Sequence, residues 1–391
     1  MSKHFDVAVV GAGIVGLCAA LSMNLRGFSV ALIDAGQMIV DEKNPDARVY
    51  AINEASQNLL KNLGAWQCID SSRISPYRQM YVWDSSSGAH IDFNSRMIAS
   101  DRLGTIVEES ILKKALLHAL SLQKTGISLF PNSKVKALNE YEEFIEILSE
   151  DSSWQAKLLM IADGGNSPCR QLLKVPLTSW SYHQEAIVAL VTTEKAHQQT
   201  AYQVFNKDGP LAFLPMVNEK LCSIVWSTTQ INAKELMTLS NEDFNKALTK
   251  AFAAKLGESQ VCGKRFQFPL LMRHVKQYTG SRWILLGDAA HTIHPLAGLG
   301  LNVGLADLST WLSGMEKGEK QLTAKKAMSA YQRQRKSEVW QTIAMMDSLK
   351  TLFGNSSSPV IAIRSLGLQV INHFSPIKKL FINMAIGKKA L

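Results

Sequence analysis

The sequence is poor in cysteine, and the cysteines that it has form no pattern. The five are Cys18, Cys68, Cys169, Cys222 and Cys262, and no two of them make a Cys-x-x-Cys pair. An odd and scattered count is typical of reduced thiols inside a cell. It argues against a disulfide framework and against a structural zinc site.

Long apolar runs are also lacking. No uninterrupted apolar stretch approaches the ~18 residues of a membrane-spanning helix. The chain enters a strand-like run, Phe5 to Val10, almost at once, so we expect no signal peptide. Apolar residues still make up 46% of the 391 residues, enough for a core divided between two domains. These features predict a globular, cytoplasmic protein.

Acidic residues are absent from 348 to 391. This tail carries +6 of the net charge of +9, on Lys350, Arg364, Lys378, Lys379, Lys388 and Lys389. One interpretation is an ordinary solvated helical face. Another is contact with an anionic membrane surface, where each basic residue adds ~1 kcal/mol, or with a partner protein. A nucleic-acid interface is not indicated, because no known binding module accompanies the charge.

The N-terminal region has the spacing of a dinucleotide-binding βαβ unit. A strand-like run leads into Gly11-Ala12-Gly13-Ile-Val-Gly16, apolar residues at helical spacing follow, and a second run ends at Asp34. The first glycine permits a tight turn, the second lets the backbone approach a pyrophosphate, and the third lets the helix pack on the strand. The helix N-terminus then faces the phosphates, and Asp34 accepts hydrogen bonds from ribose. The pattern predicts a dinucleotide site without deciding between NAD and FAD.

A distant segment decides between these cofactors. A buried-strand pattern, Trp283 to Leu286, is followed by a short acid, a proline–glycine loop and the start of a helix. The residues of this motif are Gly287, Asp288, Pro295, Gly298, Gly300, Leu301 and Asn302. A carboxylate at a strand end, Asp288, suits a ribityl hydroxyl, and a helix starting near Gly300 favours the negative charge of a reduced flavin. A nicotinamide has no use for this second site, so the motif favours FAD.

Together these motifs resemble those of the class A flavin monooxygenases, the p-hydroxybenzoate hydroxylase superfamily. A third segment agrees: Asp163-Gly164, with Ser167 and Arg170 downstream, is similar to the Asp-Gly motif of that family. The resemblance spans nearly the whole chain. It narrows to the ubiquinone-biosynthesis hydroxylases (UbiH/UbiF/VisC type) through segments such as 48–56 and 209–215.

The resemblance implies an α/β fold, with a p-hydroxybenzoate-hydroxylase-like FAD-binding Rossmann domain, an inserted sheet-based substrate domain and a C-terminal helical tail. Substrate and flavin would meet between the two domains. The expected boundaries are 1–75, 100–178 and 268–345 for the FAD-binding domain, 76–99 and 179–267 for the substrate domain, and 346–391 for the basic amphipathic tail.

The resemblance also implies which residues hold the cofactor. Arg48 would lie beside the flavin, and Asp163 would support both FAD and NAD(P)H. The expected cofactor-binding set is Gly11, Ala12, Gly13, Gly16, Asp34, Arg48, Val135, Asp163, Gly287, Asp288, Pro295, Gly298, Gly300, Leu301 and Asn302. We assign no catalytic side chain. His291 and His294 are spaced like a metal pair, but no third ligand is near them in the sequence, so we expect no metal.

The implied reaction is hydroxylation of an aromatic ring. NAD(P)H would reduce FAD, O2 would add to the flavin as a C4a-hydroperoxide, and one oxygen atom would pass to an electron-rich phenol in a water-free site. The implied substrate is a polyprenylated phenol of ubiquinone biosynthesis. The tail would then contact the inner face of the membrane or a ubiquinone-biosynthesis complex.

Two departures from the family pattern keep rival hypotheses open. Leu299 stands where the family usually has glutamine, and Glu109 stands where it often has asparagine. One rival is an FAD monooxygenase of a soluble aromatic compound, which a polar, arginine-lined pocket would favour. The other is a flavin-loaded, non-catalytic subunit of a biosynthetic complex.

Aromatic residues are frequent in the expected substrate domain. They either pack in its core or line an apolar substrate cavity, and the sequence does not separate these roles. The residues in question are Trp180, Tyr182, Phe205, Phe213 and Trp226.

Overall fold

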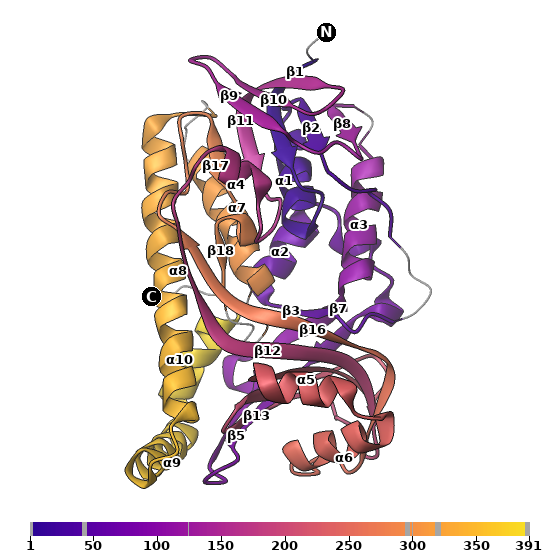
Figure 1. Cartoon of the computed structure of the whole chain (residues 1–391), viewed down its shortest axis with the longest axis vertical. Helices are drawn as coiled ribbons and strands as arrows, with labels where there is room; N and C mark the ends of the chain where they lie inside the picture. Colours follow the sequence, from indigo (N-terminus) through magenta and orange to yellow (C-terminus); the bar gives the residue numbers. More distant parts are fainter. Residues whose placement is uncertain are drawn as a thin grey trace.

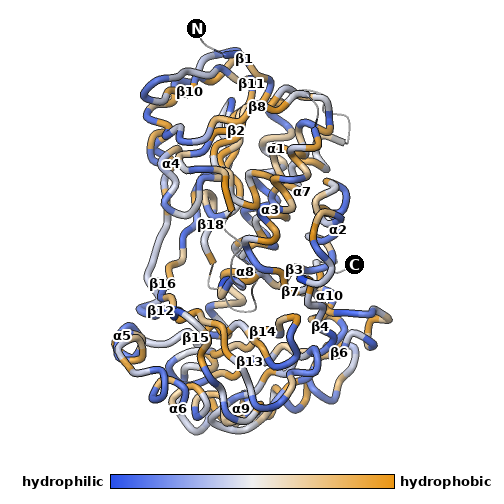
Figure 2. Tube along the Cα trace, turned by 90° about the vertical axis from the view of Figure 1, so that its right-hand side faces the viewer, coloured by the Kyte–Doolittle hydropathy of each residue, from blue (hydrophilic) through white to orange (hydrophobic). Residues whose placement is uncertain are grey.

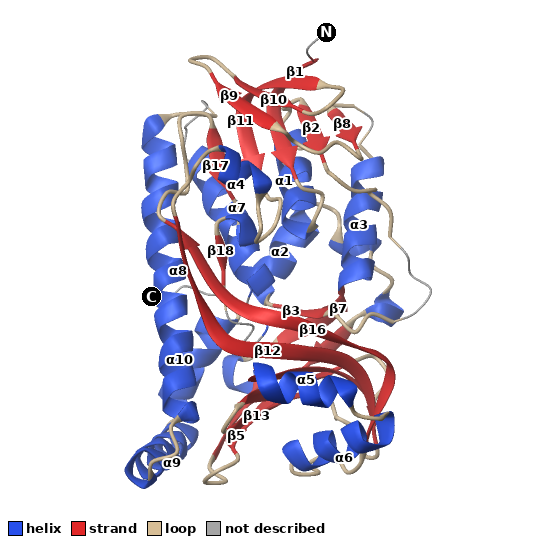
Figure 3. Ribbon diagram, in the orientation of Figure 1, coloured by secondary structure: helices blue, strands red, loops and turns tan. Residues whose placement is uncertain are grey.

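A computed structural model describes residues 3–40, 45–123, 125–293, 298, 300–316 and 322–387. In this part of the chain there are three β-sheets, helices packed around the first sheet, and a helical tail (Figure 3). The predicted α/β fold is thereby confirmed.

The first sheet is mainly parallel and lies at one end of the molecule (Figure 1). Its strands follow the order β8, β2, β1, β11, β10 and β9, and β17 pairs in parallel with β11. The strands are β1 (Lys3–Val10), β2 (Val30–Ile33), β8 (Ile127–Phe130), β9 (Ala137–Glu140), β10 (Ile145–Leu148), β11 (Ser153–Ile161) and β17 (Trp283–Leu285). Continuous apolar runs, visible around β2 in Figure 2, are typical of a sheet buried by helices.

Helices pack around this sheet. Helix α1 (Ile14–Asn24) contacts α3 (Glu109–Ser121) and α7 (Gly300–Glu316), and α7 contacts α8 (Lys325–Gly354). Nearly every residue of α1 is buried, so this helix has no polar face. Helix α8 runs along one side of the molecule from the first sheet towards the second (Figure 1).

The second sheet is larger and mainly antiparallel. Its strands follow the order β18, β16, β12, β15, β14, β13, β5 and β6. Helices α5 (Gln230–Thr238) and α6 (Asn241–Ala251) pack against it. The strands are β5 (Gln79–Asp84), β6 (His90–Asn94), β12 (Leu177–Thr193), β13 (Thr200–Asn206), β14 (Gly209–Pro215), β15 (Leu221–Thr229), β16 (Ser259–Val275) and β18 (His291–Thr292).

The aromatic residues of this sheet mostly pack in its core. Phe213 is fully buried and stacks on Phe252, with ring centroids 3.7 Å apart. Trp226 is buried in the same cluster. Phe205 stacks on Phe353 of α8, with ring centroids 3.9 Å apart. Core packing is therefore the role that the structure gives these side chains.

Two long strands connect the sheets. Strands β12 and β16 pair with each other along most of their length and carry a register shift between Ser181 and Glu185. The predicted domain boundaries near 179 and 267 fall inside these strands. No linker separates the two parts at these points, and the division into domains stays a prediction.

A small third sheet lies between the other two. It consists of β3 (Val49–Ile52), β7 (Gly104–Glu108) and β4 (Ser75–Tyr77), paired antiparallel in that order. Helix α2 (Glu54–Asn62) follows β3. The short elements are α4 (Pro168–Leu172) and the 3-10 turns η1 (Trp66–Cys68), η2 (Ser71–Arg73), η3 (Ser95–Ile98) and η4 (Gly287–Ala289).

The tail consists of α9 (Ser358–His373) and α10 (Ser375–Ala385). Arg364 is buried, and its Nε donates to Asp84 Oδ2 at 2.9 Å. Lys378 is also buried, with its Nζ 3.3 Å from Asp92 Oδ2. The interpretation of the tail cations as a solvated face is therefore wrong for these two, because the fold uses their charges internally. No described helix is long and apolar enough to cross a membrane.

Candidate FAD site

The register of the first sheet brings the predicted motifs to one edge. Val10 of β1 is paired with Ile33 of β2 and with Ile161 of β11, and Ile161 is paired with Leu285 of β17. These parallel strands therefore end at the same level. The segments that follow them are the glycine loop, the strand end with Asp34, the Asp-Gly motif and the Gly-Asp motif. Ligands of open α/β sheets bind outside this edge.

The glycine loop is as tight as the motif predicts. Gly11 has a φ of 105°, and a Cβ added there would lie 2.3 Å from the carbonyl oxygen of Ala162. A Cβ at Gly16 would lie 1.8 Å from the oxygen of Gly11. A Cβ at Gly13, in contrast, meets no atom within 4 Å. Two of the glycines are thus required by packing, and the third leaves open space beside the loop.

Asp34 closes the loop from the neighbouring strand. Its Oδ2 accepts a hydrogen bond from the backbone N–H of Ala12 at 2.5 Å, and its Oδ1 accepts one from Gly36 at 2.8 Å. Helix α1 begins after Gly13, which provides no side-chain cap. The first N–H groups of α1 are therefore available to a phosphate.

Asp163 follows β11 and faces the same edge. Its Oδ2 accepts from the backbone N–H of Cys169 at 3.0 Å, whereas its buried Oδ1 has no partner in the described residues. Burial and the Asp163 charge raise the pKa of Cys169 well above its ordinary value. Arg170 joins this motif to the next one, because its guanidinium donates to the carbonyl oxygens of Gly165 and Ala289.

Asp288 is exposed at the end of β17. The surrounding protein desolvates its carboxylate and raises its pKa, although the nearby charges of His291 and Arg48 act in the opposite direction. Arg48 lies just before β3, and its Nε is 3.3 Å from Glu109 Oε2. Burial would lower the pKa of Arg48, but Tyr50, Glu109 and Asp288 raise it. The carboxylate of Asp288 and the guanidinium of Arg48, from distant segments of the chain, thus lie at one site.

The start of α7 is held by β3. Asn302 donates from Nδ2 to the carbonyl oxygen of Ala51 at 2.8 Å, and its Oδ1 accepts from the backbone N–H of Asn53 at 3.1 Å. Gly298, with a φ of 63°, lies against Ala51, and a Cβ there would be 3.3 Å from the Ala51 Cβ. A Cβ at Gly300 meets nothing within 4 Å. The helix N-terminus is therefore fixed from one side and open on another.

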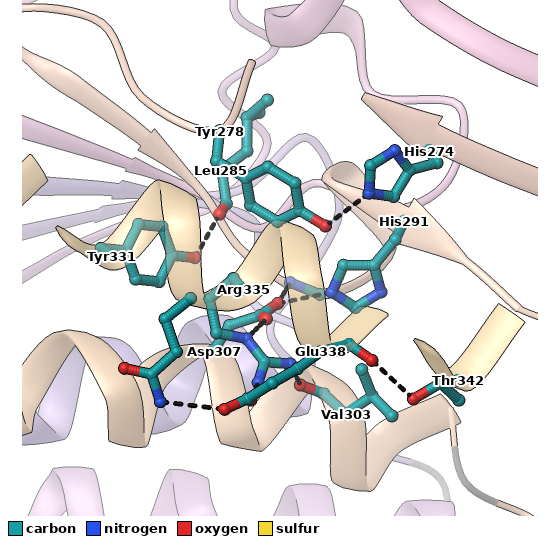
Figure 4. Close-up of polar contacts among 12 residues, drawn as sticks. His274, Tyr278, Leu285, His291, Val303, Asp307, Tyr331, Arg335, Glu338 and Thr342 are labelled. Carbon is teal, nitrogen blue, oxygen red and sulfur yellow. Dashed lines mark hydrogen bonds and ion pairs between the residues drawn. The ribbon is translucent and has the colours of Figure 1, made fainter. Parts of the chain in front are cut away.

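A buried polar network joins α7 and α8 to the Gly-Asp motif, and Figure 4 shows its members Asp307, His291 and Arg335. Asp307 of α7 is fully buried, and its Oδ2 accepts from the N–H of Gly287 and from His291 Nε2, both at 2.8 Å. Its Oδ1 accepts from Arg335 Nε of α8 at 2.6 Å. Arg335 also pairs with Glu338. Burial would raise the pKa of Asp307, but His291 and Arg335 lower it.

Two other residues of the predicted cofactor-binding set, Val135 and Leu301, pack in the core around the first sheet. Val135 is buried in the core of the first sheet, two residues after Ser133, whose N–H donates to the carbonyl oxygen of Asp34. Leu301 packs against the same core. Pro295, His294 and Leu299 lie outside the described residues. The cofactor roles assigned to the predicted set stay predictions.

Three residues of the site were not predicted. Asp307 and Arg335 form the buried pair, and Arg273 of β16 lies so near the Asp-Gly motif that its Nη1 would be 3.0 Å from a Cβ at Gly165. A signal for Asp307 does exist in the sequence, because it is an acid between the apolar residues Leu305 and Leu308. Such an acid on an apolar helix face needs a buried partner.

The residues present fit FAD. Asp163 Oδ1 is a buried acceptor that no described residue pairs with, and the N–H groups at the start of α1 have no side-chain cap. Gly13 and Gly300 leave open space beside two helix N-termini at the same edge. A long ligand with a pyrophosphate at one helix, and with a group that becomes negative near the other, matches this arrangement.

Comparison with known proteins gives the family. The model of the "FAD binding domain" family matches residues 4–346. The chain is 31% identical over 388 residues to 3-demethoxyubiquinol 3-hydroxylase from Escherichia coli (strain K12), covering 98% of both chains. It is 32% identical over 428 residues to ubiquinone biosynthesis monooxygenase COQ6, mitochondrial, from Homo sapiens, covering 96% of this chain and 91% of that one.

Solved structures show the same fold. p-Nitrophenol 4-monooxygenase PnpA from Pseudomonas putida DLL-E4 matches with a TM-score of 0.80 at 16% identity, covering 100% of both chains. PqsL, a probable FAD-dependent monooxygenase from Pseudomonas aeruginosa, matches with a TM-score of 0.75 at 19% identity, covering 94% of this chain and 100% of that one. The chain belongs to the FAD-binding family and is a class A flavin monooxygenase that acts on aromatic rings. Its cofactor is FAD, and NAD(P)H and O2 are its co-substrates.

Proposed function

We propose that the chain hydroxylates the ring of a polyprenylated phenol in ubiquinone biosynthesis. Relatives at 31% and 32% identity carry names from this pathway and align over nearly the whole chain. The structural observation that accompanies these names is a buried apolar cluster at both ends of the flavin loop. A prenylated ring needs such surroundings, because it has little polar area to pair with protein groups.

Residues on both sides of the flavin loop belong to this cluster. Ile293 directly precedes the loop, and Val303 lies in the first turn of α7 that follows it. Both pack in one cluster with residues of the second sheet, among them Val225 and Leu270. All described members of this cluster are aliphatic, aromatic or methionine side chains. Apolar surroundings beside the flavin loop are what an isoprenoid chain requires.

We assign different parts of FAD to different residues of the site. We assign the pyrophosphate to the glycine loop at Gly11–Gly13 and the ribityl chain to Asp288, while Asp163 supports FAD and the visiting NAD(P)H. FAD, when bound, accepts hydride from NAD(P)H and activates O2 for transfer to the ring. The N-terminus of α7, held by Asn302, then lies where it stabilises negative charge. The apolar cluster excludes water from the ring.

A substrate series tests this proposal. We expect kcat/KM for NAD(P)H-dependent hydroxylation to rise from an unprenylated phenol to phenols with one, two and three isoprene units, because each unit buries more apolar area. A soluble hydroxybenzoate provides the comparison. A higher kcat/KM for the hydroxybenzoate than for every prenylphenol would instead establish the soluble-substrate rival. Failure of every phenol to accelerate flavin reduction would support the non-catalytic rival.

We also propose that the tail lies on an anionic membrane surface, from which such a substrate would be taken. Three apolar side chains of α9 and one directly after it are exposed: Ile363 is 68% exposed, Leu366 62%, Val370 54% and Phe374 52%. They recur at helical spacing, and exposed Lys379 follows on α10 without any acid in the tail. Apolar and basic groups on neighbouring helices are typical of an interfacial anchor.

Vesicle flotation tests the membrane contact. The double variant Leu366→Ser/Phe374→Ser is expected to float at least several-fold less with anionic vesicles than the wild-type chain, since it loses two large apolar contacts. The control is Ile231→Ser on α5, which removes a side chain that is 71% exposed far along the sequence from the tail. Equal flotation of all three proteins would refute the anchor and favour a partner protein.

A further inference from the structure

The C-terminal helix ends against the segment that holds the start of α7. We propose that the end of the tail is a positioning element of the flavin site, and that Asn53 is the residue that transmits its effect. This inference goes beyond the proposed function, because it concerns FAD binding and holds for any substrate. It rests on a chain of contacts from α10 through α2 to α7.

The first contact is the docking of α10. Ile382 and Ile386 are buried in an apolar cluster with Leu103. The carbonyl oxygen of Ile386 accepts from the backbone N–H of Ala55 at 3.3 Å. Gly387, with a φ of 81°, is so close that an added Cβ would lie 2.7 Å from the Ala55 Cβ. The end of the tail is therefore fitted against the first turn of α2.

Asn53 is the point where three elements meet. Its Nδ2 donates to the carbonyl oxygen of Ala385 at 3.2 Å, which ties it to the end of α10. Its Oδ1 accepts from the N–H of Ser56 at 2.9 Å and so caps α2. Its backbone N–H donates to Asn302 Oδ1 at 3.1 Å. Side chain and backbone of one residue thus join the tail, α2 and the start of α7.

Asn302 completes the connection to the flavin site. Its side chain is buried and uses both polar atoms, accepting from Asn53 and donating to Ala51. It lies in the first turn of α7, whose N-terminus we expect to face the flavin edge. A shift of Asn53 would therefore change the position of the N–H groups that we expect to stabilise a reduced flavin. Placement within about 0.5 Å is what such a group requires.

Chain ends are usually mobile unless they are tied down. Here the tail is tied at several points before its end. Arg364 of α9 pairs with Asp84 of β5 at 2.9 Å, with both side chains 1% exposed, and Lys378 Nζ of α10 lies 3.3 Å from Asp92 Oδ2 of β6. The end of α10 therefore reaches Asn53 as part of a fixed helix pair.

The substitution Asn53→Asp tests the connection with little change of shape. Aspartate keeps an oxygen that caps α2, but it cannot donate to Ala385, and its charge faces a carbonyl oxygen at a helix C-terminus. In the apoprotein we expect faster amide exchange at the end of α10 and in the first turns of α7. We expect the Kd for FAD to rise about tenfold, the change that ~1.4 kcal/mol produces.

A second variant approaches the same contact from the tail. Gly387→Ala places a methyl group against Ala55 and forces the end of α10 to move. Its control is Gly367→Ala on α9, where an added Cβ meets no atom within 4 Å. We expect Gly387→Ala to reproduce the weaker FAD binding and the faster exchange in α7. We expect Gly367→Ala to bind FAD like the wild-type chain.

Titration of apoprotein with FAD well below the melting temperature separates positioning from simple stability. A structural role alone would lower the thermal midpoint and leave Kd and α7 exchange unchanged. The proposal is overturned if Asn53→Asp or Gly387→Ala frees the end of α10 while the Kd for FAD and amide exchange in α7 stay at wild-type values. It is also overturned if Asn53→Asp leaves the end of α10 as protected as before, because Asn53 then does not hold it.

Discussion

Asp307 offers the sharpest test of how the Gly-Asp motif is held. The substitution Asp307→Asn removes one negative charge from a fully buried site and keeps the shape of the side chain. Both carboxylate oxygens accept from donors, Oδ1 from Arg335 and Oδ2 from Gly287 and His291. Either orientation of the new amide therefore turns an N–H group towards a donor.

The expected cost follows from what remains unpaired. Arg335, with 2% of its side chain exposed, would keep Glu338, whose side chain is 39% exposed, as its charged partner, and its hydrogen bond to the carbonyl oxygen of Val303. Breaking a buried ion pair from one side costs about 3–5 kcal/mol. The remaining pair with Glu338 places the expected loss at the lower end, about 3 kcal/mol. This is a large part of the roughly 5–15 kcal/mol that separates the folded from the unfolded state of ordinary domains.

Urea unfolding followed by tryptophan fluorescence measures this loss, with Trp311 of α7 as a nearby reporter. Glu242→Gln is the control, since it removes an exposed helix pair with Lys246 and should leave the midpoint unchanged. The folded pKa of Asp307 is lowered below 3.8, so its contribution is complete above pH 3.8 and is lost as pH falls through the folded value. A loss below about 1 kcal/mol at pH 7, with an unchanged denaturant slope, would refute the reasoning.

Three further predictions concern other parts of the molecule. Asp84→Asn leaves buried Arg364 without its charge partner, so limited proteolysis should cut the tail helices several-fold faster than in the wild-type chain; an unchanged rate would mean that this pair does not hold the tail. His274 is buried, and burial lowers its pKa from 6.5 to about 4, so the free energy of unfolding should fall as pH drops from 6.5 to 4. The fall over this pH range should be smaller in His274→Gln. An NMR titration that gives His274 a pKa near 6.5 in the folded protein would contradict this prediction. Gly11→Ala forces a methyl group onto a backbone carbonyl and should weaken FAD binding about 100-fold, the equivalent of ~2.7 kcal/mol. Gly88→Ala, at a positive φ with open space around it, should bind FAD like the wild-type chain. Equal FAD binding by the two variants would contradict the packing argument.

The sequence was sufficient for the parts of the fold that are local in the chain. The βαβ unit follows from glycine spacing and from apolar period, and the structure places β1, α1 and β2 where this pattern predicts them. The convergence of Asp34, Asp163 and Asp288 could also be foreseen, because each ends a strand of a parallel sheet. Their common level, however, is set by the register of the strands, and no local pattern records that register.

Long-range polar pairs were beyond the reach of the sequence. Arg335 and Asp307 come from two helices whose packing decides which charges meet, and Arg364 pairs with a carboxylate 280 positions earlier. The sequence alone does not separate buried from exposed basic residues of the tail. In the structure, burial divides them: Arg364 and Lys378 serve the fold, and Lys379 remains exposed. The connection from Gly387 to Asn302 through Asn53 depends on the same docking.

Anaerobic flavin reduction followed by admission of oxygen tests whether this chain hydroxylates a prenylated ring. FAD-loaded protein is mixed anaerobically with NAD(P)H and a short-chain prenylphenol, flavin reduction is followed by absorbance, and ¹⁸O₂ is then admitted. We predict that the phenol accelerates flavin reduction and that the product carries one ¹⁸O atom on its ring. Reduction that no prenylphenol accelerates, or reoxidation that yields only hydrogen peroxide and unchanged phenol, would contradict it.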